Sequence, residues 1–152
     1  MRGIRPETVW GTLFFMAVLT AHPGISPAQN VENVDLTFIV ASNEGTANTV
    51  ANPKYNEQLK KMFSYSSYVQ SGEVKDTVEF NKPKTVAVPG DYELELTLKN
   101  CEEGRCIMRA VIRKGGKDYV DTIISLMKPG VFLLGGPRAD MRDLIIVIEM
   151  GF

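Results

Sequence analysis

Histidine and tryptophan are almost absent from this sequence of 152 residues. The single histidine, His22, and the single tryptophan, Trp10, both lie within the first 28 residues. If that segment is removed, the remaining chain has no imidazole to act as a general base near neutral pH or to ligate zinc. We therefore predict no catalytic residue, no metal site and no cofactor, and we expect a protein that is not an enzyme.

The first 28 residues have the features of a signal peptide. Arg2 and Arg5 precede an apolar run over residues 12–21, and the small residues of Ser26-Pro27-Ala28 suit a signal peptidase. The run is shorter than the roughly 20 residues that a membrane span needs, so an uncleaved anchor is the lesser alternative. We predict a signal peptide over 1–28, a single domain over 29–152, and export to the periplasm or the extracellular space.

Charge of one sign is also lacking. The chain has 17 basic and 18 acidic residues and a net charge of −1, and the two signs are interspersed along it. A protein that follows a phosphate backbone needs a basic stripe or patch. The sequence therefore predicts no nucleic-acid partner.

Residues 91–127 have the pattern of three consecutive antiparallel strands. From Asp91 to Lys99, apolar and polar residues alternate, which is typical of a strand with one buried face. A loop of Glu102-Glu103-Gly104 and a turn at Gly115-Gly116 then join the strands, with the glycines at positive φ. This register predicts that Leu98 pairs with Met108.

Asp121 is the one exception to this pattern. If the turn at Gly115-Gly116 pairs Ile112 with Tyr119, Asp121 falls on the apolar face. A carboxylate there is either a functional group or lies where the strand twists out into water, and we favour the second interpretation.

The rest of the chain predicts short strands and one helix. Asn52 is suited to cap a helix that begins at Pro53 and presents Tyr55, Leu59, Met62 and Phe63 on one face. Strands are expected at 34–42, 84–88, 131–134 and 144–150, with two weak segments on either side of Gly72. The predicted fold class is all-β: an antiparallel sandwich of about eight strands with one short covering helix, with a small barrel as the alternative.

The two cysteines, Cys101 and Cys106, flank the first turn of the three-stranded segment. An oxidising compartment favours a disulfide between them. The three-residue loop, however, pairs Cys101 with Arg105 and turns Cys106 to the opposite face, where no bridge can form. A four-residue loop, or a bulge near Gly104, would bring both sulfurs to the same face.

The expected function is binding. We predict a protein-interaction or structural module of the cell envelope or extracellular space, which would contact a protein partner through a sheet edge or through Tyr65 and Tyr68. The alternative is a small outer-membrane β-barrel, because the alternation from Leu144 to Phe152 looks like the closing strand of such barrels. Only under that alternative is the membrane a partner.

Overall fold

Eight antiparallel strands and one helix make up the computed structural model, which describes residues 31–139 and 142–151. The signal peptide predicted over 1–28 lies outside these residues. The elements in chain order are β1 (Val31–Ser42), α1 (Pro53–Met62), β2 (Ser67–Glu79), β3 (Pro83–Val88), β4 (Tyr92–Glu102), β5 (Arg105–Lys114), β6 (Lys117–Met127), β7 (Gly130–Ala139) and β8 (Arg142–Met150). The all-β fold class and the single short helix are confirmed.

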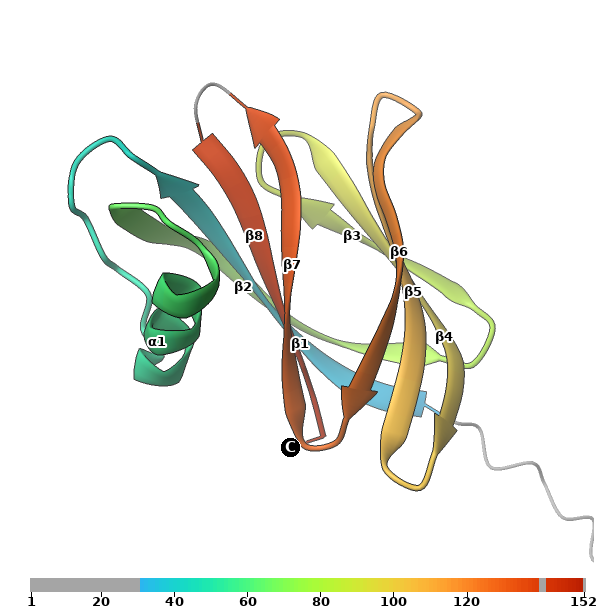
Figure 1. Cartoon of the computed structure of the whole chain (residues 1–152). Helices are drawn as coiled ribbons and strands as arrows, with labels where there is room; N and C mark the ends of the chain where they lie inside the picture. The colour runs from blue at the N-terminus through green and yellow to red at the C-terminus, as the bar shows by residue number, and fades with distance from the viewer. Residues whose placement is uncertain (1–30, 140–141, 152) are drawn as a thin grey trace, which may run out of the picture.

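The strands form two sheets of four. The first has the order β2-β1-β8-β7 and the second has the order β3-β4-β5-β6, so the fold is the predicted sandwich. The second sheet contains the predicted three-stranded segment as β4, β5 and β6. β6 and β7 belong to different sheets and diverge from the turn that joins them (Figure 1).

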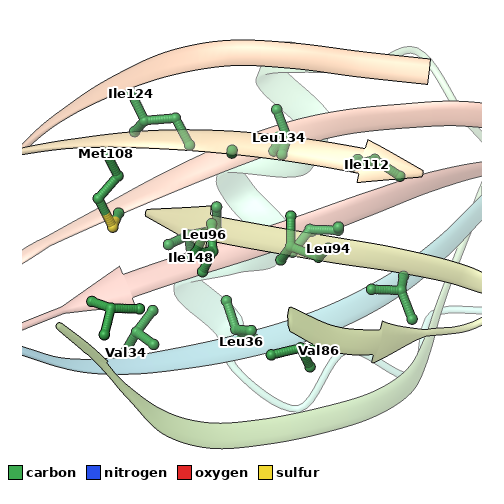
Figure 2. Close-up of a cluster of buried hydrophobic side chains, with 14 of the residues drawn as sticks. Val34, Leu36, Val86, Leu94, Leu96, Met108, Ile112, Ile124, Leu134 and Ile148 are labelled. Atoms are coloured by element: carbon green, nitrogen blue, oxygen red, sulfur yellow. The ribbon is translucent and has the colours of Figure 1, made fainter. Parts of the chain in front are cut away.

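The main core lies between the two sheets (Figure 2). Alternate residues of each strand point into it, as the pleat of a strand dictates. The largest fully buried side chains of this layer are Leu36, Leu94, Leu96, Leu98, Met108, Ile112, Ile124 and Ile146. Its continuity across both sheets explains why the hydrophobic alternation in the sequence was a reliable guide.

A second, smaller core lies between the first sheet and α1. Ile145 and Val147 of β8 face it while their neighbours face the main core, so β8 is covered on both sides as its apolar sequence predicted. The Asn52 side chain caps the helix by accepting a hydrogen bond from the Lys54 N–H, at 3.0 Å. Tyr55 and Leu59 are buried, but Met62 is 62% exposed, so its predicted burial is wrong. None of the helical structure in the described residues has the length and hydrophobicity of a membrane span.

The β4–β5 hairpin corrects the predicted turn. The loop has two residues, Glu103 and Gly104, both at positive φ, and Lys99 is an extra residue that forms a bulge in β4. Leu98 still pairs with Met108, as predicted. Beyond the bulge Cys101 pairs with Cys106, because one inserted residue exchanges the two faces of the strand.

A bulge also corrects the β5–β6 hairpin. Arg113 pairs with Asp118 as predicted, but Tyr119 is an extra residue and Ile112 pairs with Val120. The inserted residue turns Asp121 to the outer face, where it lies opposite Val111. The predicted position of Asp121 on the apolar face is therefore wrong, and the interpretation that it is solvent-exposed is right.

Two interruptions expected from glycine and proline are absorbed within continuous strands. β2 runs through Gly72 as one strand with Ser71 as an extra residue, rather than as two weak segments. β7 likewise continues past Gly135 to Ala139, with a register shift around Pro137. Bulges accommodate these residues because a bulge leaves one position outside the hydrogen-bonded ladder.

Candidate interaction surface

Cys101 and Cys106 are cross-strand partners at the closed end of the β4–β5 hairpin. Their Cα atoms are 4.0 Å apart and their sulfurs lie at disulfide distance. Cys106 is fully buried and Cys101 packs against the main core, so the pair joins the hairpin end to the sandwich interior. This arrangement is structural, because a buried sulfur offers little access to a reaction partner.

Tyr65 and Tyr68 were predicted as a binding surface, and the structure separates their roles. Tyr68 is only 2% exposed, and its hydroxyl donates to the Phe63 carbonyl at 2.8 Å and accepts from the Tyr65 N–H at 3.3 Å. Burial raises its pKa. Tyr68 thus belongs to the core beneath α1, and only the half-buried Tyr65 ring, packed edge-on against it, reaches the surface.

Asp121 belongs to a set of ion pairs on the outer face of the second sheet. The Arg109 guanidinium donates two hydrogen bonds to its carboxylate, at 2.8 and 2.6 Å, and these hold the pKa of Asp121 below its ordinary value. Arg113 bridges two carboxylates, with Glu95 at 2.7 Å and Asp118 at 2.6 Å. A carboxylate that is fully ionised and engaged by a bidentate arginine is poorly suited to proton transfer near neutral pH.

A second polar cluster lies at the first turn of α1. Tyr55 donates a hydrogen bond to Glu149, and Lys75 pairs with Asp35 at 3.0 Å. Burial raises the pKa of Glu149. Asp35 and Glu149 are directly paired across β1 and β8, so Lys75 and Tyr55 offset the repulsion between two carboxylates. The cluster is therefore explained by the packing of α1 on the sheet.

Three of the four sheet edges carry features that discourage pairing with another strand. β2 alternates charged residues along its exposed side and is tied to the neighbouring edge by the Asp76–Lys84 ion pair, at 2.8 Å. That neighbour, β3, is short and begins at Pro83. β7 contains Pro137, which lacks an N–H, and its pairing shifts register there. Each feature removes a backbone hydrogen-bond donor, adds a charge to the edge or shortens the stretch of strand that could pair.

The fourth edge, β6, has few such features. Within the described residues it pairs with β5 alone, and it has neither charge nor proline from Thr122 to Met127. Ile123 is 61% exposed and Met127 53% exposed on its outer face. The half-buried Ile107 of β5 lies diagonally opposite both residues. Together, Ile107, Ile123 and Met127 form what we call the β6 patch.

The β6 patch continues into a shallow depression of about 500 Å³ at the end of the β4–β5 hairpin. Ile107 and Met127 line its apolar side, while Glu102, Glu103 and Arg105 line its polar side. An apolar surface with a polar rim beside a free strand edge is the arrangement that strand addition uses, with backbone hydrogen bonds along the edge and side-chain contacts beside it.

No protein-family model, no curated protein and no solved structure matches this chain. The site therefore depends on geometry alone. The β6 patch was not predicted from the sequence, although Ile123 and Met127 carry a signal. They share a face with Asp121 and Ser125, and that face is solvent-exposed only when the bulge at Tyr119 is taken into account.

Proposed function

We propose that this chain is an exported, non-enzymatic interaction module that binds a protein partner through the β6 edge. The supporting observation is the contrast between β6 and the other three edges, because β6 alone combines a free side, an uncharged stretch and exposed aliphatic side chains. The proposed location, the periplasm or the extracellular space, depends on the sequence of residues 1–28.

The polar sites support a binding role over a catalytic one. Asp121 is held by Arg109, and Glu149 accepts a hydrogen bond from Tyr55. Both carboxylates therefore have structural partners that account for their positions. An enzyme would instead present a nucleophile or base directed at space that a substrate can occupy.

The alternative from the sequence is a small outer-membrane barrel. Such a protein presents an apolar belt to lipid on its outer face. Here the outer face of one sheet carries α1 and that of the other carries the Arg109 and Arg113 ion pairs, so we favour the soluble module. Fractionation decides between them, because the soluble module is released by a detergent-free, high-salt extraction and the barrel is retained in the membrane.

Site-specific photo-crosslinking tests the binding site. A photoreactive residue replaces Ile123 in the full chain expressed in cells that export it, and the control replaces Met62, which is equally exposed but lies on α1. We expect a covalent adduct with protein from the Ile123 position and little from the Met62 position. Equal adducts at both positions, or none at Ile123, would overturn the proposed site.

A further inference from the structure

We infer that the partner on the β6 edge is a second copy of this chain, paired antiparallel with β6 about a two-fold axis at Ile123. This inference rests on the proposed function, because it names the occupant of the same edge. It joins two four-stranded sheets into one continuous sheet through a β6–β6 seam.

The geometry of antiparallel pairing restricts the possible seams. Residues directly opposite each other point to the same face, so a symmetric seam must be centred on a residue and not between two residues. The outer face of β6 carries Asp121, Ile123, Ser125 and Met127, and the inner face carries Val120, Thr122, Ile124 and Leu126. The choice of centre then decides which side chains meet.

A centre at Ile123 sets no carboxylate against an aliphatic side chain. Ile123 meets its own copy on the outer face, and Val120 meets Leu126 of the partner copy on the inner face. Asp121 lies opposite Ser125, so no two like charges face each other, and Arg109 already neutralises Asp121 within each copy. Cross-strand pairs of β-branched and aliphatic residues are the favourable units of a sheet.

A centre one residue earlier, at Thr122, is less favourable. It places Asp121 opposite Ile123, so each copy sets a carboxylate against an aliphatic side chain. The seam centred on Ile123 is also bounded at both ends. The bulge at Tyr119 ends the regular ladder on one side, and Pro129, which lacks an N–H, follows the strand on the other.

The test compares three lysine substitutions at exposed positions, each in the protein purified from cells that express the full chain. I123K sets two lysines opposite each other at the axis, S125K sets a lysine opposite Asp121 of the other copy, and M62K is the control away from the seam. Analytical ultracentrifugation over a range of protein concentrations measures the dimer dissociation constant. Circular dichroism verifies that each variant is folded, as expected for exposed positions.

We expect a concentration-dependent dimer in the unmodified chain and in M62K. I123K should weaken dimerisation at least about tenfold, the scale of one disrupted favourable contact at an interface. S125K should leave the dissociation constant unchanged or lower it, because opposite charges face each other across the seam. A monomer at every concentration would overturn the inference, as would I123K behaving like M62K. S125K weakening the dimer as strongly as I123K would exclude this register.

The crosslinking result separates this inference from the proposed function. An adduct at Ile123 of twice the chain mass supports the second copy. An adduct of any other mass retains the β6 edge as a binding site and refutes self-pairing. The absence of an adduct at Ile123 refutes both.

Discussion

The hydroxyl group of Tyr68 provides a sharp test of how α1 is attached to the sandwich. The substitution Y68F keeps the ring, which is buried among Leu59, Tyr55 and the outer face of the first sheet, and removes only the oxygen. That oxygen connects the chain just after the helix, at Phe63 and Tyr65, to the start of β2. The change therefore isolates one buried polar contact from the packing around it.

The expected magnitude follows from the hydrogen bonds. Y68F leaves the Phe63 carbonyl without its 2.8 Å donor and the Tyr65 N–H without its acceptor. Leaving buried polar groups unsatisfied costs about 1–3 kcal/mol, and we expect a loss near 2 kcal/mol. For a domain of this size that corresponds to a fall in Tm of roughly 8 °C.

Urea denaturation of the protein purified from cells that express the full chain measures this loss. We expect a lower midpoint with an unchanged m-value, because the surface exposed on unfolding is the same. The matched control is Y119F, since Tyr119 is 46% exposed and the loss of its hydroxyl should change the free energy of unfolding by less than about 0.5 kcal/mol. A loss for Y68F as small as that of the control would refute the assignment of Tyr68 to a buried hydrogen-bonding role.

Three further predictions concern other parts of the fold. C101A/C106A should lower the free energy of unfolding by about 2 kcal/mol, as for a disulfide that closes a very short loop, and thiol labelling of the denatured, unreduced wild type should find no free cysteine. Because burial raises the pKa of Glu149, folding favours the protonated form of this side chain. The stabilisation of the fold that results is fully present below the ordinary glutamate pKa of 4.5 and is lost as the pH rises through the folded-state pKa. E149Q should thus flatten the fall in Tm above pH 4.5 while keeping an acceptor for Tyr55, and a pH profile parallel to wild type would contradict this. Deleting Tyr119 should give a folded protein, because the flanking pairs are already in register; the change removes the edge contact with Tyr92, worth about 0.5–1.5 kcal/mol in a denaturation experiment, and the exposed contact of the ring with Lys117, and an unfolded product would refute that register.

The sequence predicts most of the fold because local signals and the main core agree. Alternation identified β4 to β6, the helix cap at Asn52 was recognisable from its residue type, and the apolar run of β8 indicated burial on both faces. Leu98 and Met108 were paired correctly because hydrophobic faces must match across a ladder. Each of these features depends on residues that are close in sequence, or on the rule that the apolar faces of paired strands must match.

The errors in strand register share one physical cause, which is the bulge. Each of the extra residues Lys99, Ser71 and Tyr119 shifts the pairing by one position, and nothing in the local residue pattern requires this. The position of a bulge depends on how the two whole strands pack in the fold. Counting residue pairs outward from the turn therefore gives the wrong partners beyond the bulge. The register counted from the turns puts Cys101 and Asp121 on the wrong face for this reason, whereas the favoured disulfide and the favoured solvent-exposed Asp121 agree with the structure.

The same bulges create the features from which function is inferred. Without the extra residue Lys99, Cys101 would point away from Cys106 and the hairpin end would not be joined to the core. The extra residue Tyr119 turns both Asp121 and Ile123 to the outer face of β6. There Arg109 pairs with Asp121, and Ile123 is the most exposed aliphatic side chain of the strand. An edge strand that carries an isolated carboxylate resists pairing, whereas one with a neutralised carboxylate next to isoleucine can accept a strand. The register of one hairpin therefore determines whether β6 can bind a partner, and any variant that alters this register should alter binding even when no residue of the patch is changed.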